Sequence, residues 1–334
     1  MDALYLLVGL VVLAAVIVDI LWTTLWVDGG SGPLSARLTT WTWRGLRAVG
    51  GDHPRALSIA GPLILTLTLA MWIALLWFGW TFIFASGEPA LVGPHTGEPA
   101  DWAGRFYYVA YTMFTNGNGD YSPTTGTWEI ASSFTTATGM AFVTLGVSYV
   151  LTVLGAVSEK RSFASGVTGL GERSEAFVRA GWNGDDEEFR GLDLPLESLS
   201  TQLSLLADQH KAYPILHYYH SERGTRASAI AVPILDEALT LFRHGVSADA
   251  RPNPALVENA RSSVDSYLDT LGTAFIDPAD EVPPEPELER LREEGIPTVD
   301  DEELADALES LTERRRKLLG VVRADAWYWP PIEE

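Results

Sequence analysis

A short polar stretch, residues 111–120, lies between two apolar segments that are each long enough to cross a bilayer. Its sequence, YTMFTNGNGD, is too polar for a membrane helix, and Gly117 and Gly119 alternate with asparagines. Glycine accepts backbone conformations with positive φ that other residues resist, so such a run can alternate in handedness and point its carbonyl groups to one side. Irregular backbone at membrane depth is tolerated only where protein buries it or where it lines a watery path. The stretch therefore predicts a re-entrant loop on such a path; the alternative is a glycine-rich turn outside the membrane.

The same stretch carries the spaced motif Thr-x-x-Thr-x-Gly-x-Gly-Asp at Thr112, Thr115, Gly117, Gly119 and Asp120. This motif resembles the filter pattern of potassium channels, and Tyr107-Tyr108 resembles the aromatic pair of their pore helix. The resemblance covers residues 57–157. It implies an outer helix, a pore helix, a filter and an inner helix, with four copies placing stacked rings of backbone oxygen around a cation.

The filter that this resemblance implies consists of Thr115, Asn116, Gly117, Asn118, Gly119 and Asp120. A permeant K+ is expected at Thr115, Asn116, Gly117 and Asn118, and no cofactor beyond this ion, or Na+, is expected. The sequence departs from the family at two positions, because Asn116 stands where valine or isoleucine is usual and Asn118 where tyrosine or phenylalanine is usual. If the asparagines hydrogen-bond to the pore-helix tyrosines, the filter stays rigid and prefers potassium, which is the alternative that we favour. If they are hydrated instead, the rings widen and sodium passes as well.

Residues 102–114 are predicted to form the pore helix, with Asp101 as its N-cap. The C-terminal end of this helix would point into the membrane, where its partial negative charge favours a cation. The residues expected to support the filter from this helix are Tyr107, Tyr108, Tyr111 and Thr112.

The third apolar segment, residues 128–157, contains an unusual group of hydroxyl side chains. Of these, Thr135, Thr136 and Thr138 are predicted to line a water-filled cavity, because hydroxyl groups that face lipid gain little. The alternatives are that they bond to a neighbouring helix or back to their own backbone. Gly139 follows Gly117 by 22 positions. Potassium-channel inner helices resemble this spacing, which implies a gating hinge at Gly139.

Three apolar runs predict three membrane-spanning helices, at residues 4–27, 60–84 and 128–157. The connection 28–56 contains four arginines and an amphipathic segment, residues 35–49, and the third run is followed by Lys160 and Arg161. The positive-inside rule places these basic residues in the cytoplasm. The N-terminus and the pore loop are then outside, and the C-terminal half is cytoplasmic.

One carboxylate, Asp19, interrupts the first apolar run. A carboxylate buried in a membrane is a functional candidate by default. The alternative, which we favour, is that Asp19 lies near the membrane interface or pairs with an arginine of the following segment, since only Trp22 and Trp26 separate it from the polar boundary.

Residues 160–334 carry 34 Asp or Glu residues against 18 Lys or Arg residues. An acidic domain is a poor partner for nucleic acid or for an anionic lipid surface, so neither is expected. The glycine- and serine-rich residues 162–171 are predicted to be a linker. Helical periodicity predicts an all-helical bundle beyond it, with helices at residues 174–181, 195–221, 225–245, 253–275 and 299–325.

Three histidines, His210, His217 and His220, fall close together in this half. Two of them share a helix face, which admits a metal or proton sensor. Such histidines are more often packed in a core or at the surface, and that is the interpretation that we favour.

These features predict an all-α membrane protein with one membrane helix and an amphipathic loop in residues 1–56, a pore domain in 57–157, and an acidic helical cytoplasmic domain in 158–334. The predicted function is a homotetrameric cation channel that conducts potassium, with its own copies, the lipid bilayer and monovalent cations as partners. No P-loop, nucleophile elbow or zinc motif occurs in the sequence, so an enzyme is not expected. The alternatives are a poorly selective cation channel and a non-conducting membrane receptor or scaffold.

Overall fold

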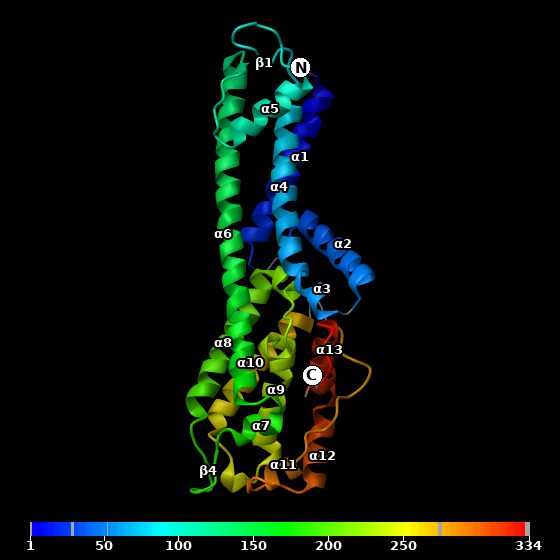
Figure 1. Ribbon diagram of the computed structural model, residues 1–334, viewed down its shortest axis with the longest axis vertical. Coiled ribbons are helices and arrows are strands. Elements are labelled where there is room, and N and C mark those ends of the chain that lie inside the picture. Colours follow the sequence, from blue (N-terminus) through cyan, green and yellow to red (C-terminus); the bar gives the residue numbers. More distant parts are fainter. Residues whose placement is uncertain (1, 28–29, 52, 273–275, 331–334) are drawn as a thin grey trace. The chain divides into compact units, whose positions relative to one another are not determined.

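The structure, a computed structural model, describes residues 2–27, 30–51, 53–272 and 276–330 (Figure 1). Its internal contacts divide the chain into two compact units. The membrane unit comprises Met1–Gly45 and Pro62–Val153, and the C-terminal unit comprises Leu46–Gly61 and Leu154–Glu334.

Three helices among the described residues are long and apolar enough to cross a membrane: α1 (Ala3–Leu25), α4 (Ala60–Ala85) and α6 (Gly126–Leu170). The predicted all-α membrane fold with three spans is therefore confirmed. The chain between α4 and α6 forms β1 (Leu91–Val92), α5 (Trp102–Met113) and β2 (Ser122–Pro123). β1 pairs antiparallel with β2, and Figure 1 shows α5 lying between α4 and α6.

The helix α6 is much longer than the predicted third span. Its 45 residues correspond to about 67 Å at 1.5 Å per residue, roughly twice the thickness of a bilayer core. The predicted linker at residues 162–171 is wrong, because α6 continues through it to Leu170. Phe163 and Val167 on this part of the helix are fully buried in the core of the C-terminal unit, and this packing outweighs a composition typical of linkers.

The carboxylate of Asp19 is fully buried in the membrane unit and caps the next helix, α2 (Pro33–Gly50). It accepts hydrogen bonds from the amides of Leu34 (2.7 Å) and Ser35 (3.1 Å) and from the indole of Trp72 on α4 (2.9 Å). The predicted pairing with an arginine is wrong. The first amides of a helix need acceptors, and Asp19 supplies one from a neighbouring helix. The carboxylate thus fixes the start of the predicted amphipathic helix against α1 and α4.

The C-terminal unit is a helical bundle, as predicted. Its α-helices include α3 (Pro54–Ser58), α7 (Ser174–Arg179), α8 (Asp193–Ala212), α9 (Ser228–Thr240), α10 (Pro254–Gly272), α11 (Glu289–Arg292), α12 (Asp301–Ser310) and α13 (Thr312–Ala324). Its other elements are the hairpin of β3 (Trp182–Asn183) and β4 (Glu188–Phe189) and the short helical segments η1 (Pro214–Tyr218), η2 (Gly224–Arg226), η3 (Leu241–Gly245) and η4 (Ala248–Ala250). The helix predicted to run to residue 221 ends at Ala212, because Pro214 lacks the amide hydrogen that a continuing helix needs.

Buried ion pairs connect α9 to α13. Arg314 donates to both carboxylate oxygens of Asp236 at 3.0 Å, and Arg315 donates to Glu237 at 2.8 and 3.0 Å. The side chains of Asp236, Glu237 and Arg315 are all buried. Removing one partner of a buried pair costs about 3–5 kcal/mol, because it leaves a charge without compensation, so these pairs fix how the two helices pack.

The three neighbouring histidines do not form a metal site among the described residues. His210 is buried, its Nδ1 lies 2.8 Å from the Leu206 carbonyl oxygen, and its ring meets Tyr267 edge-on. His220 Nε2 instead lies 3.0 Å from a carboxylate oxygen of Asp325. Across the described parts of the chain, no three His, Cys, Asp or Glu side chains are grouped to hold a metal ion. For His210 the favoured interpretation, a packed core histidine, is confirmed.

The C-terminal unit is expected to lose stability in acid because of His210. Burial, and then the nearby charge of Lys160, lower the pKa of His210 to about 3. The unfolded chain takes up this proton near pH 6.5 whereas the folded chain does not. The contribution is therefore fully present above about pH 6.5 and is lost toward pH 3, by at most about 1.4 kcal/mol per pH unit. His210→Phe keeps the ring contact with Tyr267 and should flatten the fall of the melting temperature between pH 6.5 and 4.5; an unchanged slope would contradict this assignment.

Candidate ion-conduction site

The pore helix α5 begins as predicted. The side chain of its N-cap, Asp101, accepts a hydrogen bond from the Gly104 amide at 2.7 Å. Trp77 of α4 holds the middle of the helix, since its indole donates to the Phe106 carbonyl oxygen at 2.8 Å and its ring stacks on the Phe106 ring at 4.2 Å between centroids. These contacts within one chain hold α5 in place, independently of the residues that follow it.

After α5 the backbone alternates in handedness. The φ angle is +59° at Thr115, +60° at Gly117 and +78° at Gly119, whereas the intervening Asn116 and Asn118 do not have positive φ. Such an alternation turns successive amide N–H groups to one side of a strand and the carbonyl oxygens to the other. This is the backbone form that the glycine pattern predicts, and contact of its carbonyl oxygens with a cation stays a prediction.

Thr115 adopts this form although a β-branched residue rarely has positive φ. Two backbone bonds hold the chain there. The Thr115 amide donates to the Thr112 carbonyl oxygen at 3.1 Å, and the Asn116 amide donates to the Tyr111 carbonyl oxygen at 2.7 Å. The last turn of the pore helix thus directs the first residues of the alternating stretch.

A chain of side-chain hydrogen bonds runs beside this stretch. Asn116 Nδ2 donates to Asn118 Oδ1 at 3.1 Å, and Asn118 Nδ2 donates to the hydroxyl oxygen of Tyr107 at 2.5 Å. The Tyr107 hydroxyl in turn donates to a carboxylate oxygen of Asp120 at 2.9 Å. The favoured alternative for the two asparagines, hydrogen bonding to the pore helix, is the one that the structure contains.

The other two pore-helix tyrosines support the site without contacting the asparagines. The Tyr111 hydroxyl donates to the Tyr121 carbonyl oxygen at 3.0 Å, just after the alternating stretch. The Tyr108 hydroxyl and Ser132 Oγ of α6 lie 2.5 Å apart. Among the described contacts, Tyr107 is thus the pore-helix tyrosine that takes part in the predicted network with the asparagines.

Comparisons with known proteins bear on this arrangement. A family model described as "Ion channel" matches residues 65–156, which include most of α4, all of α5, the alternating stretch and most of the apolar part of α6. The chain belongs to the two-helix ion channel pore family. The chain is also 44% identical, over 330 residues, to the Bacillus subtilis (strain 168) protein named "Uncharacterized membrane protein YdjJ". That match covers 99% of this chain and 96% of the relative. No solved structure matches the chain.

The inner-helix threonines of this channel contact helices of their own chain. Thr135 is fully buried, and its hydroxyl donates to the Ala131 carbonyl oxygen at 2.9 Å. Thr138 accepts a hydrogen bond from the indole of Trp80 on α4 at 2.9 Å. For Thr135 the predicted cavity lining is wrong, because the residue is fully buried; its hydroxyl bonds back to its own backbone, which is one of the alternatives. Thr136 and Thr138 are both half-buried, and their lining role stays a prediction.

The exposed face of α6 was missed from the sequence. It carries small or hydroxyl-bearing residues at helical spacing, namely Ser133, Ala137, Ala141, Thr144 and Ser148, all exposed in the single chain. The spacing of three or four residues was the available signal. It was overlooked because the denser run of hydroxyl groups at 132–138 covers several faces of the helix.

Gly139 of this channel lies against the end of the pore helix. It is buried, and a Cβ at this position would overlap the backbone carbonyl oxygen and the side chain of Met113. Glycine is therefore required for the close approach of α6 to α5. The hinge role implied by resemblance stays a prediction, but the packing already explains why this residue has no side chain.

Gly139→Ala is expected to destabilise the channel by about 1–3 kcal/mol, the usual cost of overpacking. The matched control is Gly155→Ala on the same helix, because a Cβ there meets nothing within 4 Å. Thermal unfolding of both full-length variants should show a lower melting temperature for the first alone. If Gly139→Ala leaves the melting temperature unchanged and alters only the open probability, the hinge explanation is the better one.

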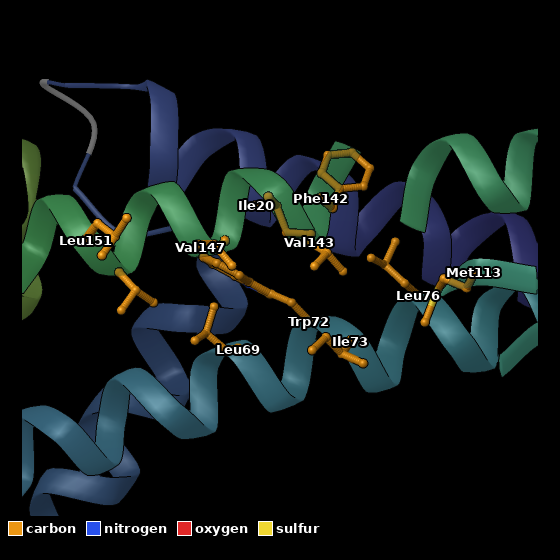
Figure 2. A pocket seen from close by; sticks show the side chains of 12 residues that line it. Ile20, Leu69, Trp72, Ile73, Leu76, Met113, Phe142, Val143, Val147 and Leu151 are labelled. Atoms are coloured by element: carbon orange, nitrogen blue, oxygen red, sulfur yellow. The ribbon is translucent and has the colours of Figure 1, made fainter. Parts of the chain in front are cut away.

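A hollow between the channel helices is apolar. A cavity of about 200 Å³ lies between α4 and α6 next to Met113. Figure 2 shows its labelled lining residues, among them Leu69, Trp72, Leu76, Phe142 and Val147. Side chains of this kind cannot replace the water around an ion, so this cavity is not a path for cations.

Proposed function

We propose that four copies of the chain assemble around a common axis as a cation channel that prefers potassium. The observation that carries this proposal is the alternation of positive φ at Thr115, Gly117 and Gly119. Carbonyl oxygens aligned on one side of four such strands would form stacked rings that replace the hydration shell of an ion. The arginines of α2 and α3 and the basic residues that follow the apolar part of α6 favour a cytoplasmic C-terminal unit, with the filter outside.

The need for several copies follows from the exposure of the site. Every residue from Phe114 to Asp120 is exposed in the single chain, so one chain can contact an ion from one side alone. The cavity between α4 and α6 is apolar and gives no path within one chain. A closed ring around an axis supplies the remaining walls, and cyclic assembly is the common way for identical chains to close one.

The preference for potassium rests on the hydrogen-bonded chain beside the filter. The bonds from Asn116 to Asn118, from Asn118 to Tyr107 and from Tyr107 to Asp120 connect the filter to a helix that α4 holds in place. A filter selects by the number and field of its carbonyl oxygens and by how firmly its surroundings hold them. A bonded network resists the widening that would admit hydrated sodium.

The exposed face of α6, Ser133, Ala137, Ala141, Thr144 and Ser148, would line the cavity inside the filter. Hydroxyl groups and small side chains leave room for water around an ion, whereas a bulky exposed residue beside this face, such as Phe134, suits lipid. This assignment replaces Thr135, which is fully buried in its own chain.

Purified full-length protein in liposomes tests the function. Potassium efflux should be fast, the detergent-solubilised particle should have four times the 36.4 kDa chain mass, and bi-ionic recordings should show potassium preferred over sodium. A tetramer that conducts both ions equally would favour the poorly selective alternative. The exposure of both asparagines is the observation that supports this alternative. A protein that conducts neither ion would leave the receptor or scaffold alternative.

A further inference from the structure

A polar hollow lies in the C-terminal unit, where the chain enters and leaves its membrane helices. This cavity of about 390 Å³ is lined by Ser58, Arg161, Ser221, Glu222, Arg223 and Arg226. Ser58 ends α3, two positions before α4 begins, and Arg161 lies on α6 just beyond the apolar part of that helix. The hollow therefore belongs to the part of the chain closest in sequence to the ends of two membrane spans.

The lining is basic in a chain that carries a net charge of −21. Among the described residues, none of the three guanidinium groups of Arg161, Arg223 and Arg226 forms an ion pair, in contrast to the arginines of α13. The one acidic side chain, Glu222, lies 3.4 Å from Ser58 Oγ and not against an arginine. Guanidinium groups with free donors around a hollow match the geometry of a phosphate, which they can bind in a bidentate manner.

The loop that carries two of these arginines is fixed to α6. Lys160 Nζ donates to the carbonyl oxygens of Leu216 (3.0 Å) and Tyr219 (3.2 Å), and Thr168 Oγ1 donates to that of Thr225 (2.9 Å). The loop is thus held by α6 on both sides of residues 221–223. A loop whose backbone is already held loses less entropy when it binds a ligand than a mobile loop does.

Two further contacts close the hollow. Ser221 Oγ donates to the Arg226 carbonyl oxygen at 2.7 Å, which bends the loop back on itself. Gly61 lies so close to the ring of Tyr219 that a Cβ would overlap it, so the loop packs directly on the start of α4. The Tyr219 hydroxyl is buried with no hydrogen-bond partner among the described residues. Burial raises the pKa of this hydroxyl to about 12, and the charge of Arg161 acts against that rise.

We propose that this hollow binds a phosphate-bearing anion, with Arg161, Arg223 and Arg226 as charged contacts and Ser58 and Ser221 as neutral ones. Two kinds of ligand carry such a phosphate group: an anionic phospholipid, in its head group, and free phosphate. The position of Ser58 just before α4 and of Arg161 just after the apolar part of α6 favours the lipid. The net acidity that argues against a broad lipid-binding surface does not argue against a local pocket of three arginines.

Binding to full-length protein in a neutral detergent tests the proposal. The probes are short-chain phosphatidylglycerol, short-chain phosphatidylcholine and inorganic phosphate, each followed by the shift in melting temperature and by native mass spectrometry. Phosphatidylglycerol should bind and raise the melting temperature, and phosphatidylcholine should not. Arg223→Gln/Arg226→Gln should weaken binding about tenfold or more, since each substitution removes charge-assisted hydrogen bonds. Glu222→Gln should strengthen it, because it removes a like charge from the pocket.

The matched control is Arg37→Gln/Arg44→Gln, which removes two exposed arginines of α2 and so changes the net charge equally. It should bind phosphatidylglycerol as the unaltered protein does. If inorganic phosphate binds with the same dependence on Arg223 and Arg226, the soluble anion is the ligand. Equal weakening in the control, or binding that does not depend on Arg223 and Arg226, would overturn the proposal. The measurement involves no ion flux, so its outcome is separate from that of the channel experiment.

Discussion

Gly117→Ala or Gly119→Ala is expected to abolish ion flux while leaving the tetramer assembled. Both glycines have left-handed backbone, with φ of +60° and +78°, and an L-residue there costs about 1–2 kcal/mol in each chain. A Cβ at either position meets nothing within 4 Å in its own chain, so the effect acts through the backbone. An alanine relieves the strain by turning its peptide group, which withdraws a carbonyl oxygen from the ring. Potassium efflux from liposomes should fall by at least about a hundredfold, because the cost recurs in four chains.

Gly97→Ala is the matched control for these two variants. Gly97 lies in the loop before the pore helix, has φ of +68°, and likewise has nothing within 4 Å of its absent Cβ. The substitution imposes the same backbone cost away from the proposed ion path, so efflux should persist. Loss of efflux in all three variants would indicate a general folding defect. Undiminished efflux in Gly119→Ala would remove the filter assignment.

The helix α5 and the alternating backbone after it were predictable because their signals are local. Asp101 precedes an amphipathic helix by one residue, and its capping bond depends on neighbours in sequence alone. The positive φ at Gly117 and Gly119 likewise follows from residue type. The spans α1 and α4 were predictable to within a few residues, since apolar length is all that their prediction requires.

The rest of α6 shows where local signals fail. Residues 162–171 contain three glycines and read as a linker, yet Phe163 and Val167 pack into a core whose other members lie far away in sequence. Thr138 is of a residue type that suits a pore lining, but its hydroxyl accepts a hydrogen bond from Trp80, whose position depends on how α4 packs. The capping role of Asp19 depends on the chain turning back after α1, because only then does α2 begin beside the carboxylate. In each case the partner is distant in sequence, and periodicity cannot show which neighbour a side chain faces.

Tyr107→Phe is expected to lower the preference for potassium over sodium about tenfold, which is about 59 mV in a bi-ionic reversal potential. The Tyr107 hydroxyl accepts from Asn118 and donates to Asp120, so its removal breaks the hydrogen-bonded chain in the middle. The amide of Asn118 then needs another acceptor, and water is the available one. Hydrated asparagines would hold the carbonyl rings less firmly and allow them to widen around hydrated sodium.

Tyr108→Phe separates this effect from a general loosening of the pore helix. It removes one hydroxyl from the adjacent position, but that hydroxyl contacts Ser132 of α6 and not the filter. The ring contact of Tyr108 with Phe84 would be kept, so the helix stays in place. Selectivity should therefore be unchanged in Tyr108→Phe and reduced in Tyr107→Phe. Equal shifts in both variants would assign selectivity to the packing of the whole helix, and no shift in Tyr107→Phe would mean that the asparagine network does not set it.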